Sequence, residues 1–257
     1  MPSSSTPSSA RRPGWLVPVL VVLVAAVLVA VSLLARDGED ADAGTAEEPG
    51  GTTAERGPTA EGPVAEVVEP EQEALPDMAR RAPDDPMAVG PADAPVSLVV
   101  YSDFQCPFCA MWSEQTQPTM LERAEADDLR IEWRDINVFG QESLTSARAA
   151  YAAGLQGRYV EYHDALFEGG EKRPAGALDE ESLIELAAEL GLDTERFTAD
   201  LRSEEVAAAV AENQDEAASL GVYSTPAFLL GGTPILGAQP TDVFVEALDD
   251  ALAEAQG

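Results

Sequence analysis

The only two cysteines of this 257-residue chain lie three positions apart, in the motif Cys-Pro-Phe-Cys at residues 106–109. The residues before them, 96–101, read VSLVVY, and such a short apolar run rich in β-branched side chains is typical of a strand buried on both faces. The turn SDFQ follows, and proline at position 107 suits the first turn of a helix. Residues 129–138 alternate apolar with polar side chains, which predicts a second strand. We therefore expect the cysteines at the start of a helix inside a strand, helix, strand unit.

The place of the motif in this unit predicts its chemistry. Unpaired backbone N–H groups and the positive end of the helix dipole stabilise a thiolate at a helix N-terminus and lower the pKa of the thiol. We expect Cys106 to be an exposed nucleophile, which attacks and is attacked. Cys109, one turn further along, is expected to close the intramolecular disulfide and release a mixed-disulfide partner. This redox-active disulfide takes the place of a cofactor, and none is expected.

Three alternative roles for the cysteine pair are less favoured. A purely structural disulfide would close a loop of only a few residues and gain little loop entropy. A zinc site usually has four ligands dominated by Cys and His, and two cysteines with the lone His163 fall short in a monomer, so no metal is expected. Two inert thiols do not suit an oxidising compartment. His163 is predicted to be an ordinary helix residue, and Trp112 and Phe104 to be packing groups, with Phe104 near enough to line the site.

The residues after the motif predict helices. Pro118 is expected to kink the first helix or divide it in two. Residues 142–220 have a helical period and are rich in Ala, Glu and Leu, with breaks near four positions that indicate four or five helices. The helical insertion therefore covers about residues 141–220.

A hairpin and a last helix close the chain. Residues 227–230 predict a short apolar strand, the next two glycines a hairpin turn, and residues 233–236 its partner strand. Thr241 is expected to be the N-cap of a final amphipathic helix. The fold class is thus α/β, with a central mixed sheet and an all-helical insertion.

A long apolar run near the N-terminus limits where the folded domain can begin. Residues 15–35 hold 21 positions without a charge, and a helix of that length spans a hydrocarbon core of about 30 Å. A soluble core helix would need a polar face, and a cleaved signal peptide usually has a shorter run, so a retained signal anchor is preferred, with cleavage as the alternative. Arg11 and Arg12 predict a cytoplasmic segment 1–14, a single pass through the cell membrane and an extracytoplasmic domain.

The next segment, residues 36–78, is predicted to be a disordered acidic linker. Thirteen Asp or Glu side chains stand against one Arg after residue 36, and such a segment cannot bury enough apolar surface to offset its ordering entropy. The folded domain is then residues 79–257. The net charge of the whole chain is −32 at pH 7, which argues against binding to nucleic acid or docking on anionic lipid.

Two stretches of the sequence resemble a known family. The string DDPMAVGPADAPVSLVVYSDFQCPFC, which ends at Cys109, and the string STPAF at residues 224–228 are similar to the DsbA-like branch of the thioredoxin-fold thiol:disulfide oxidoreductases. The resemblance covers residues from about 84 to the C-terminus and implies a thioredoxin-like fold in which the helices are an insertion.

The resemblance also implies a substrate-binding loop. In that family a proline with a cis peptide bond lies against the two cysteines, and Pro226, preceded by Thr225, matches it. A cis proline is a specified feature, and the exposed backbone before it can pair with an extended substrate strand. A trans proline that opens the strand at residues 227–230 is the alternative that the sequence leaves open.

The chain departs from the family pattern at one position. Many relatives carry a buried acid six residues before the first cysteine, where this chain has Val100. Proton transfer then goes through water, or Asp103 substitutes as a proton relay, or turnover differs from the family norm. The dipeptide between the cysteines, Pro107 and Phe108, brings no charge, so thiolate stabilisation is expected mainly from the helix terminus.

The predicted function is an extracytoplasmic thiol:disulfide oxidoreductase. In the preferred hypothesis the oxidised pair donates its disulfide to exported cysteine-containing proteins, and the family resemblance implies a membrane quinone-linked oxidase as the partner that recharges it. A reductant or electron relay, for example toward cytochrome maturation, uses the same residues. A membrane-tethered binding module with inert cysteines is the third hypothesis. The three differ in the stability of the reduced form and in whether Cys106 is needed.

Overall fold

The computed structural model describes residues 75–256 of the chain. The predicted membrane anchor at 15–35 lies outside these residues, as do the predicted cytoplasmic segment 1–14 and most of the linker predicted at 36–78. Within the described part, no helix combines the length and the apolar character that crossing a membrane requires.

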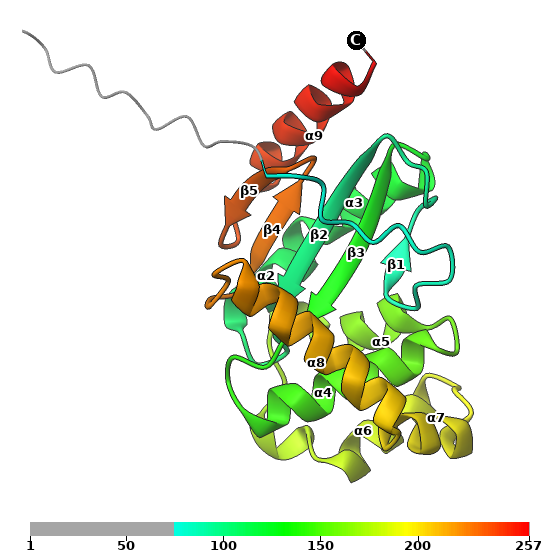
Figure 1. Cartoon of the computed structure of the whole chain (residues 1–257). Coiled ribbons are helices and arrows are strands. Elements are labelled where there is room, and N and C mark those ends of the chain that lie inside the picture. Colours follow the sequence, from blue (N-terminus) through cyan, green and yellow to red (C-terminus); the bar gives the residue numbers. More distant parts are fainter. Residues whose placement is uncertain (1–74, 257) are drawn as a thin grey trace, which may run out of the picture. The chain divides into compact units, whose positions relative to one another are not determined.

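Five strands form one mixed sheet with β2 at its centre (Figure 1). Their order across the sheet is β1, β3, β2, β4, β5. The strands are β1 (Ala88–Val89), β2 (Val96–Ser102), β3 (Leu129–Asp135), β4 (Ala227–Leu230) and β5 (Thr233–Leu236). β2 and β3 run parallel, and the other neighbouring pairs are antiparallel. The predicted α/β class and mixed sheet are confirmed.

The strand predictions hold closely for β2, β4 and β5 and fail at the end of β3. The predicted strand continued to residue 138, whereas β3 ends at Asp135. Beyond it the backbone bonds to side chains: the N–H of Asn137 donates to Gln214 Oε1, and the N–H of Val138 donates to Asp103 Oδ2. The two-residue strand β1 was not predicted, because two residues carry no readable alternation.

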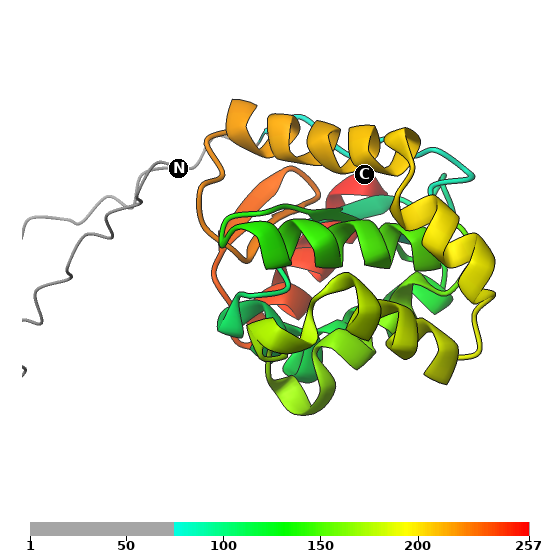
Figure 2. The same ribbon diagram turned by 90° about the horizontal axis from the view of Figure 1, so that it is seen from below.

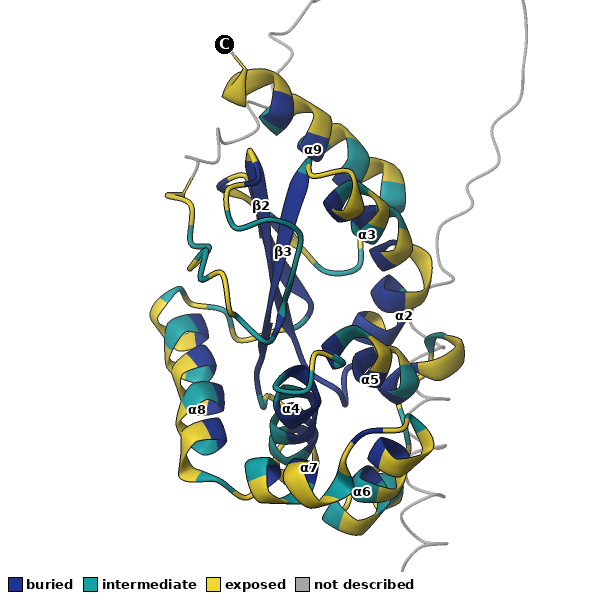
Figure 3. Ribbon diagram, turned by 90° about the vertical axis from the view of Figure 1, so that its right-hand side faces the viewer, coloured by how far each residue is buried: buried dark blue, intermediate teal, exposed yellow. Residues whose placement is uncertain are grey.

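The helices cover both faces of the sheet and one of its ends. They are α2 (Pro107–Gln115), α3 (Gln117–Glu125), α4 (Gln141–Gly154), α5 (Tyr159–Leu166), α6 (Glu180–Glu189), α7 (Thr194–Leu201), α8 (Glu204–Ser219) and α9 (Thr241–Ala255), with 3-10 turns η1 (Glu168–Gly170) and η2 (Ala175–Ala177). Helices α2, α3 and α9 lie on one side of the sheet and α8 on the other (Figure 3). Helices α4 and α8 lie side by side (Figure 2), and α8 also packs against β3. The predicted all-helical insertion is confirmed.

Two local predictions have different outcomes. The first helix is divided as expected, because α2 ends at Gln115 and Pro118 is the second residue of α3. The expected N-cap at Thr241 is wrong, since Pro240 precedes the helix and Thr241 is its first residue. The Thr241 hydroxyl instead donates to the carbonyl oxygen of Gln115 at 3.1 Å, so it ties α9 to the end of α2.

Alternating side chains of the central strands divide the core into two clusters. Leu98, Val100 and Trp133 point toward α2, in the larger cluster, which also contains both cysteines. Val99 and Tyr101 point to the opposite face, in a smaller cluster completed by Ala217 of α8 and other apolar side chains. The carboxyl ends of β2 and β3 therefore lie near the N-terminus of α2, on the face of the sheet that the larger cluster covers.

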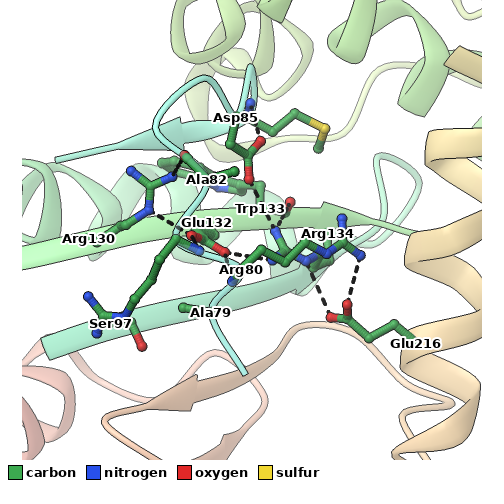
Figure 4. A network of polar contacts seen from close by, with 12 residues as sticks. Ala79, Arg80, Ala82, Asp85, Ser97, Arg130, Glu132, Trp133, Arg134 and Glu216 are labelled. Carbon is green, nitrogen blue, oxygen red and sulfur yellow. Dashed lines mark hydrogen bonds and ion pairs between the residues drawn. The ribbon is translucent and has the colours of Figure 1, made fainter. Parts of the chain in front are cut away.

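The second face of β3 buries an ion network (Figure 4). Glu132 is fully buried, and its two carboxylate oxygens accept hydrogen bonds from Arg130 Nε and Arg134 Nη2, both at 2.6 Å. The backbone N–H groups of Arg80 and Arg81 donate to the same two oxygens at 2.8 Å. The network thus ties the segment before β1 to strand β3.

Candidate active site

The N-terminus of α2 carries the cysteine motif. Cys106 precedes the first helical residue and has an extended backbone, with φ −88° and ψ 118°, and Pro107 begins the helix. The N–H of Cys106 donates to the carbonyl oxygen of Asp103 at 2.9 Å, which closes the turn between β2 and α2. The proline fits because an N–H at this position has no partner within the helix.

The loop before β4 covers the first thiol. The Thr225–Pro226 peptide bond is cis, and Cys106 Sγ lies 3.1 Å from the carbonyl oxygen of Thr225. The side chain of Cys106 is only 1% exposed, so the expectation of an exposed nucleophile is wrong for this conformation. The physical reason is the position of the loop, which lies directly against the sulfur. The fold thus brings Thr225 and Pro226 to the cysteines from 119 residues away.

The two thiols differ strongly in acidity. Both are free thiols. A hydrogen bond from the Cys109 side chain lowers the pKa of Cys106 to about 6 against the opposing effect of burial, with help from the Thr225 side chain and from the backbone N–H groups of Cys109 and Phe108. Burial raises the pKa of Cys109 well above its usual value, and the neighbouring Cys106 raises it further. At neutral pH the proton of the pair therefore belongs to Cys109.

The Asp103 carboxylate accepts hydrogen bonds from four donors. Its Oδ1 accepts from the N–H of Gln105 at 2.7 Å and from Ser143 Oγ at 2.6 Å, and its Oδ2 accepts from the N–H groups of Val138 and Phe139 at 2.7 and 3.1 Å. A carboxylate has about four lone-pair positions, and here all four are used. Asp103 therefore joins the turn before Cys106 to the segment after β3.

A second buried acid near the motif was not predicted from the sequence. Asp135, the last residue of β3, is 0% exposed, and its Oδ2 accepts a hydrogen bond from the Tyr159 hydroxyl at 2.9 Å. Burial raises the pKa of Asp135 to about 8. A signal was available, because Asp135 continues the alternation of Ile131 and Trp133 toward the buried face.

The two residues assigned to packing, Phe104 and Trp112, lie in the core as expected, and so does His163, which was predicted to be an ordinary helix residue. Phe104 is buried and stacks on Phe167, with ring centroids 5.2 Å apart. Trp112 packs on Phe228 at 4.9 Å. His163 is 1% exposed, and its ring centroid lies 5.5 Å from that of Phe104. Although His163 is distant from the motif in sequence, it packs against the turn that leads into it.

Exposed aromatic side chains lie on the segments that converge at Cys106. Phe108, between the cysteines, is 58% exposed, and Phe139, whose N–H donates to Asp103, is 53% exposed. Tyr223, two residues before Thr225, is 75% exposed. Tyr223 also borders a pocket of about 310 Å³, lined mostly by apolar side chains of the loop before β4 and of β4 and β5. Among residues 75–256, no group of three or more His, Cys, Asp or Glu side chains could hold a metal ion.

Comparison with family models and curated proteins identifies the family of the domain. Residues 83–250 match the family model described as thioredoxin. The Na(+)/H(+) antiporter NhaA 1 of Salinispora arenicola is 34% identical over 178 residues, which are 66% of this chain and 25% of the antiporter. This chain thus spans about a quarter of the length of such relatives. The probable disulfide bond formation protein D of Bacillus anthracis is 26% identical over 64% of this chain and 77% of its own length.

Solved structures of bacterial proteins have the same fold. A thioredoxin-like oxidoreductase from Silicibacter pomeroyi has a TM-score of 0.56 and 28% identity, over 67% of this chain and 93% of its own. The alpha-DsbA1 protein of Wolbachia pipientis has a TM-score of 0.60 and 18% identity, over 70% of this chain and 94% of its own. The sequence resemblance to the DsbA-like branch is confirmed at the level of family and fold.

Proposed function

Since the chain belongs to the thioredoxin family, we propose that it is an extracytoplasmic thiol:disulfide oxidoreductase that donates disulfides to exported proteins through Cys106 and Cys109. In this reaction a substrate thiolate attacks Cys106 Sγ, the bond to Cys109 breaks, and a second substrate thiol then displaces Cys106. The substrate loses two electrons and becomes a disulfide, and the cysteine pair gains them.

The observation that carries the proposal is the unequal acidity of the two thiols. A pKa of about 6 means that Cys106 is mostly a thiolate at neutral pH, and it is therefore a good leaving group from a mixed disulfide. Stabilisation of that thiolate stabilises the reduced pair, and a stabilised reduced form makes the disulfide more oxidising. This favours a donor of disulfides over a reductant.

The surroundings of Cys106 suit a polypeptide substrate. The loop before β4 presents the backbone of Thr225 to the sulfur, and an extended substrate strand would pair with this backbone. The exposed rings of Phe108, Phe139 and Tyr223 offer apolar contacts for an unfolded chain. Pro107 and Phe108 add no charge, which leaves the acidity of Cys106 to hydrogen bonds and the helix terminus.

The location and the redox partner are also proposals. We place the domain outside the cell membrane, held by a single-pass anchor at residues 15–35 with the N-terminus in the cytoplasm, because of the long apolar run and the arginines before it. A membrane quinone-linked oxidase would return the pair to the disulfide state. Exported proteins with cysteines would be its substrates.

The test uses the full chain in detergent, oxidised, mixed with a reduced unfolded protein that needs one disulfide for activity. Wild-type protein should restore that activity stoichiometrically, whereas Cys106→Ser and Cys109→Ser should each restore none, because neither variant can form the disulfide that is donated. Full activity of Cys106→Ser would reject the redox function and support a binding module. Wild-type protein that stays oxidised without transferring its disulfide would reject disulfide donation.

A further inference from the structure

The disulfide chemistry proposed above leaves one proton without an obvious source. When a thiolate attacks Cys106, Cys109 leaves with the electron pair of the broken bond and must gain a proton, because burial raises its pKa well above the usual value. The Cys109 side chain is 1% exposed, and its neighbours Ser102 and Asp103 are 3% and 0% exposed. Solvent therefore has poor access to the sulfur that needs the proton.

The acid closest in sequence to the motif does not fit this task. All four lone-pair positions of Asp103 accept hydrogen bonds from the backbone and from Ser143. These four donors leave no lone pair of Asp103 free to face Cys109. Val100, six residues before Cys106, is an apolar core residue.

Asp135 has the opposite surroundings. It is paired in register with Ser102 across the parallel strands β3 and β2, and neighbouring strands lie about 4.8 Å apart. Strand alternation points both side chains toward α2, where the Ser102 hydroxyl hydrogen-bonds Cys109. Within residues 75–256, Asp135 Oδ1 has no hydrogen-bond partner although it is fully buried. Buried polar atoms without a partner are uncommon in folded proteins, and a catalytic role is one physical reason for them.

We propose that Asp135 is the buried group that exchanges a proton with Cys109 each time the disulfide opens or closes. On opening, the Cys106–Cys109 bond breaks, the proton of the Asp135 carboxyl passes to Cys109 Sγ, and Asp135 becomes a carboxylate. On closing, Cys109 attacks the sulfur of a Cys106 mixed disulfide, the partner leaves as a thiolate, and Asp135 takes the proton back. Between the two events Asp135 can exchange its proton with solvent.

The groups around Asp135 determine its pKa. Burial raises its pKa to about 8, the Tyr159 hydroxyl on α5 lowers it, and the negative charge of Asp103 raises it. His163 of α5 packs against the Tyr159 ring, with ring centroids 5.7 Å apart. Ser102, the strand neighbour of Asp135, hydrogen-bonds Cys109 of α2. At neutral pH the carboxyl is therefore protonated and able to donate.

The inference rests on the proposed function, and the experiment separates the two. Oxidised full-length protein in detergent is reduced by dithiothreitol in single turnovers, and the rate is divided by the concentration of dithiothreitol thiolate. General acid catalysis contributes about 100-fold or more in favourable cases, so Asp135→Asn should be about 10-fold slower than wild type at pH 7. The wild-type rate should fall through an inflection near the pKa of Asp135, about 8, and the two should converge above it.

Two further variants keep the test decisive. Glu132→Gln removes a buried carboxyl from the opposite face of the same strand and should keep the wild-type inflection. Tyr159→Phe removes the hydrogen bond that lowers the pKa of Asp135, so it should move the inflection to higher pH. A pH–rate profile of Asp135→Asn that matches wild type overturns the inference. An inflection that stays at the wild-type pH in Tyr159→Phe also overturns it, and this variant serves as the test if Asp135→Asn does not fold. Wild-type protein that is not reduced by dithiothreitol would instead reject the proposed function.

Discussion

Strand β3 carries two fully buried carboxyl groups, Glu132 and Asp135, on opposite faces of the sheet. Glu132 accepts four hydrogen bonds, two from arginine side chains and two from backbone N–H groups. Burial raises the pKa of Glu132, and these donors lower it below its ordinary value overall. Asp135 has one donor, and its pKa rises to about 8. Both side chains are fully buried, so the number of donors decides whether a buried acid holds the structure together or can exchange a proton.

The largest effect expected on the Asp135 side of the sheet comes from removing the reacting sulfur. Cys106→Ser should lose all disulfide transfer, because the disulfide with Cys109 that is donated can no longer form. The free energy of unfolding of the reduced protein should change by about 1 kcal/mol or less, since the two side chains are similar in size. Transfer assays and urea unfolding, run side by side, check this. Unfolding of the variant under assay conditions would show instead that Cys106 is needed for the stability of the fold.

The next effect is on stability and belongs to the Glu132 side. Glu132→Gln leaves Arg130 and Arg134 buried without their shared counter-charge, and breaking a buried ion pair in this way costs about 3–5 kcal/mol. Disulfide transfer per folded molecule should stay at the wild-type value. Because the pKa of Glu132 is lowered in the folded state, its contribution is present above the unfolded pKa of 4.5 and lost as pH falls through the folded value. A loss well under 1 kcal/mol at neutral pH would show that the network is dispensable.

A pH-dependent effect of opposite sign is expected for Asp135. Its folded pKa lies above the unfolded value of 3.8, so between about pH 4 and about pH 8 the unfolded state ionises while the folded state keeps its proton. Wild type therefore loses stability as pH rises through this window, and Asp135→Asn does not. Urea unfolding at several pH values should show that the variant gains on wild type up to about pH 8 and then stays level. A constant difference across that range would mean that Asp135 is ionised in the folded protein.

The smallest effect expected is a change in acidity within the motif. Cys109→Ala removes the largest cause of the low pKa of Cys106, so that pKa should rise from about 6 by about one unit or more. Titration of the thiolate by its ultraviolet absorbance measures it, with Cys109→Ser as the control that keeps a donor. An unchanged titration in Cys109→Ala would assign the acidity to the helix terminus alone.

The sequence predicted those parts of the fold and site that depend on local pattern. The apolar run before the motif, the proline at position 107 and the glycine pair before β5 each act within a few residues, and β2, α2 and the hairpin lie where they were expected. The same holds for the Thr225–Pro226 loop, because the family resemblance supplied the long-range contact. Thr241 was misassigned because a local N-cap rule could not foresee the end of α2 beside it.

Other features depend on contacts that no local pattern records. The burial of Cys106 depends on a loop 119 residues away, and the saturation of Asp103 depends on the path of the chain after β3. The contrast between Glu132 and Asp135 depends on which donors the fold brings to each face, and the period of the strand gives only the face. Residues 1–74 carry predictions that remain to be tested, among them the anchor at 15–35.

The measurement that bears most directly on the central claim is the reduction potential of the Cys106–Cys109 pair in the full chain, equilibrated against glutathione buffers at neutral pH. The low pKa of Cys106 predicts a stabilised reduced form and a potential near the oxidising end of the range, about −120 mV. A value near about −270 mV would contradict disulfide donation and identify the protein as a reductant.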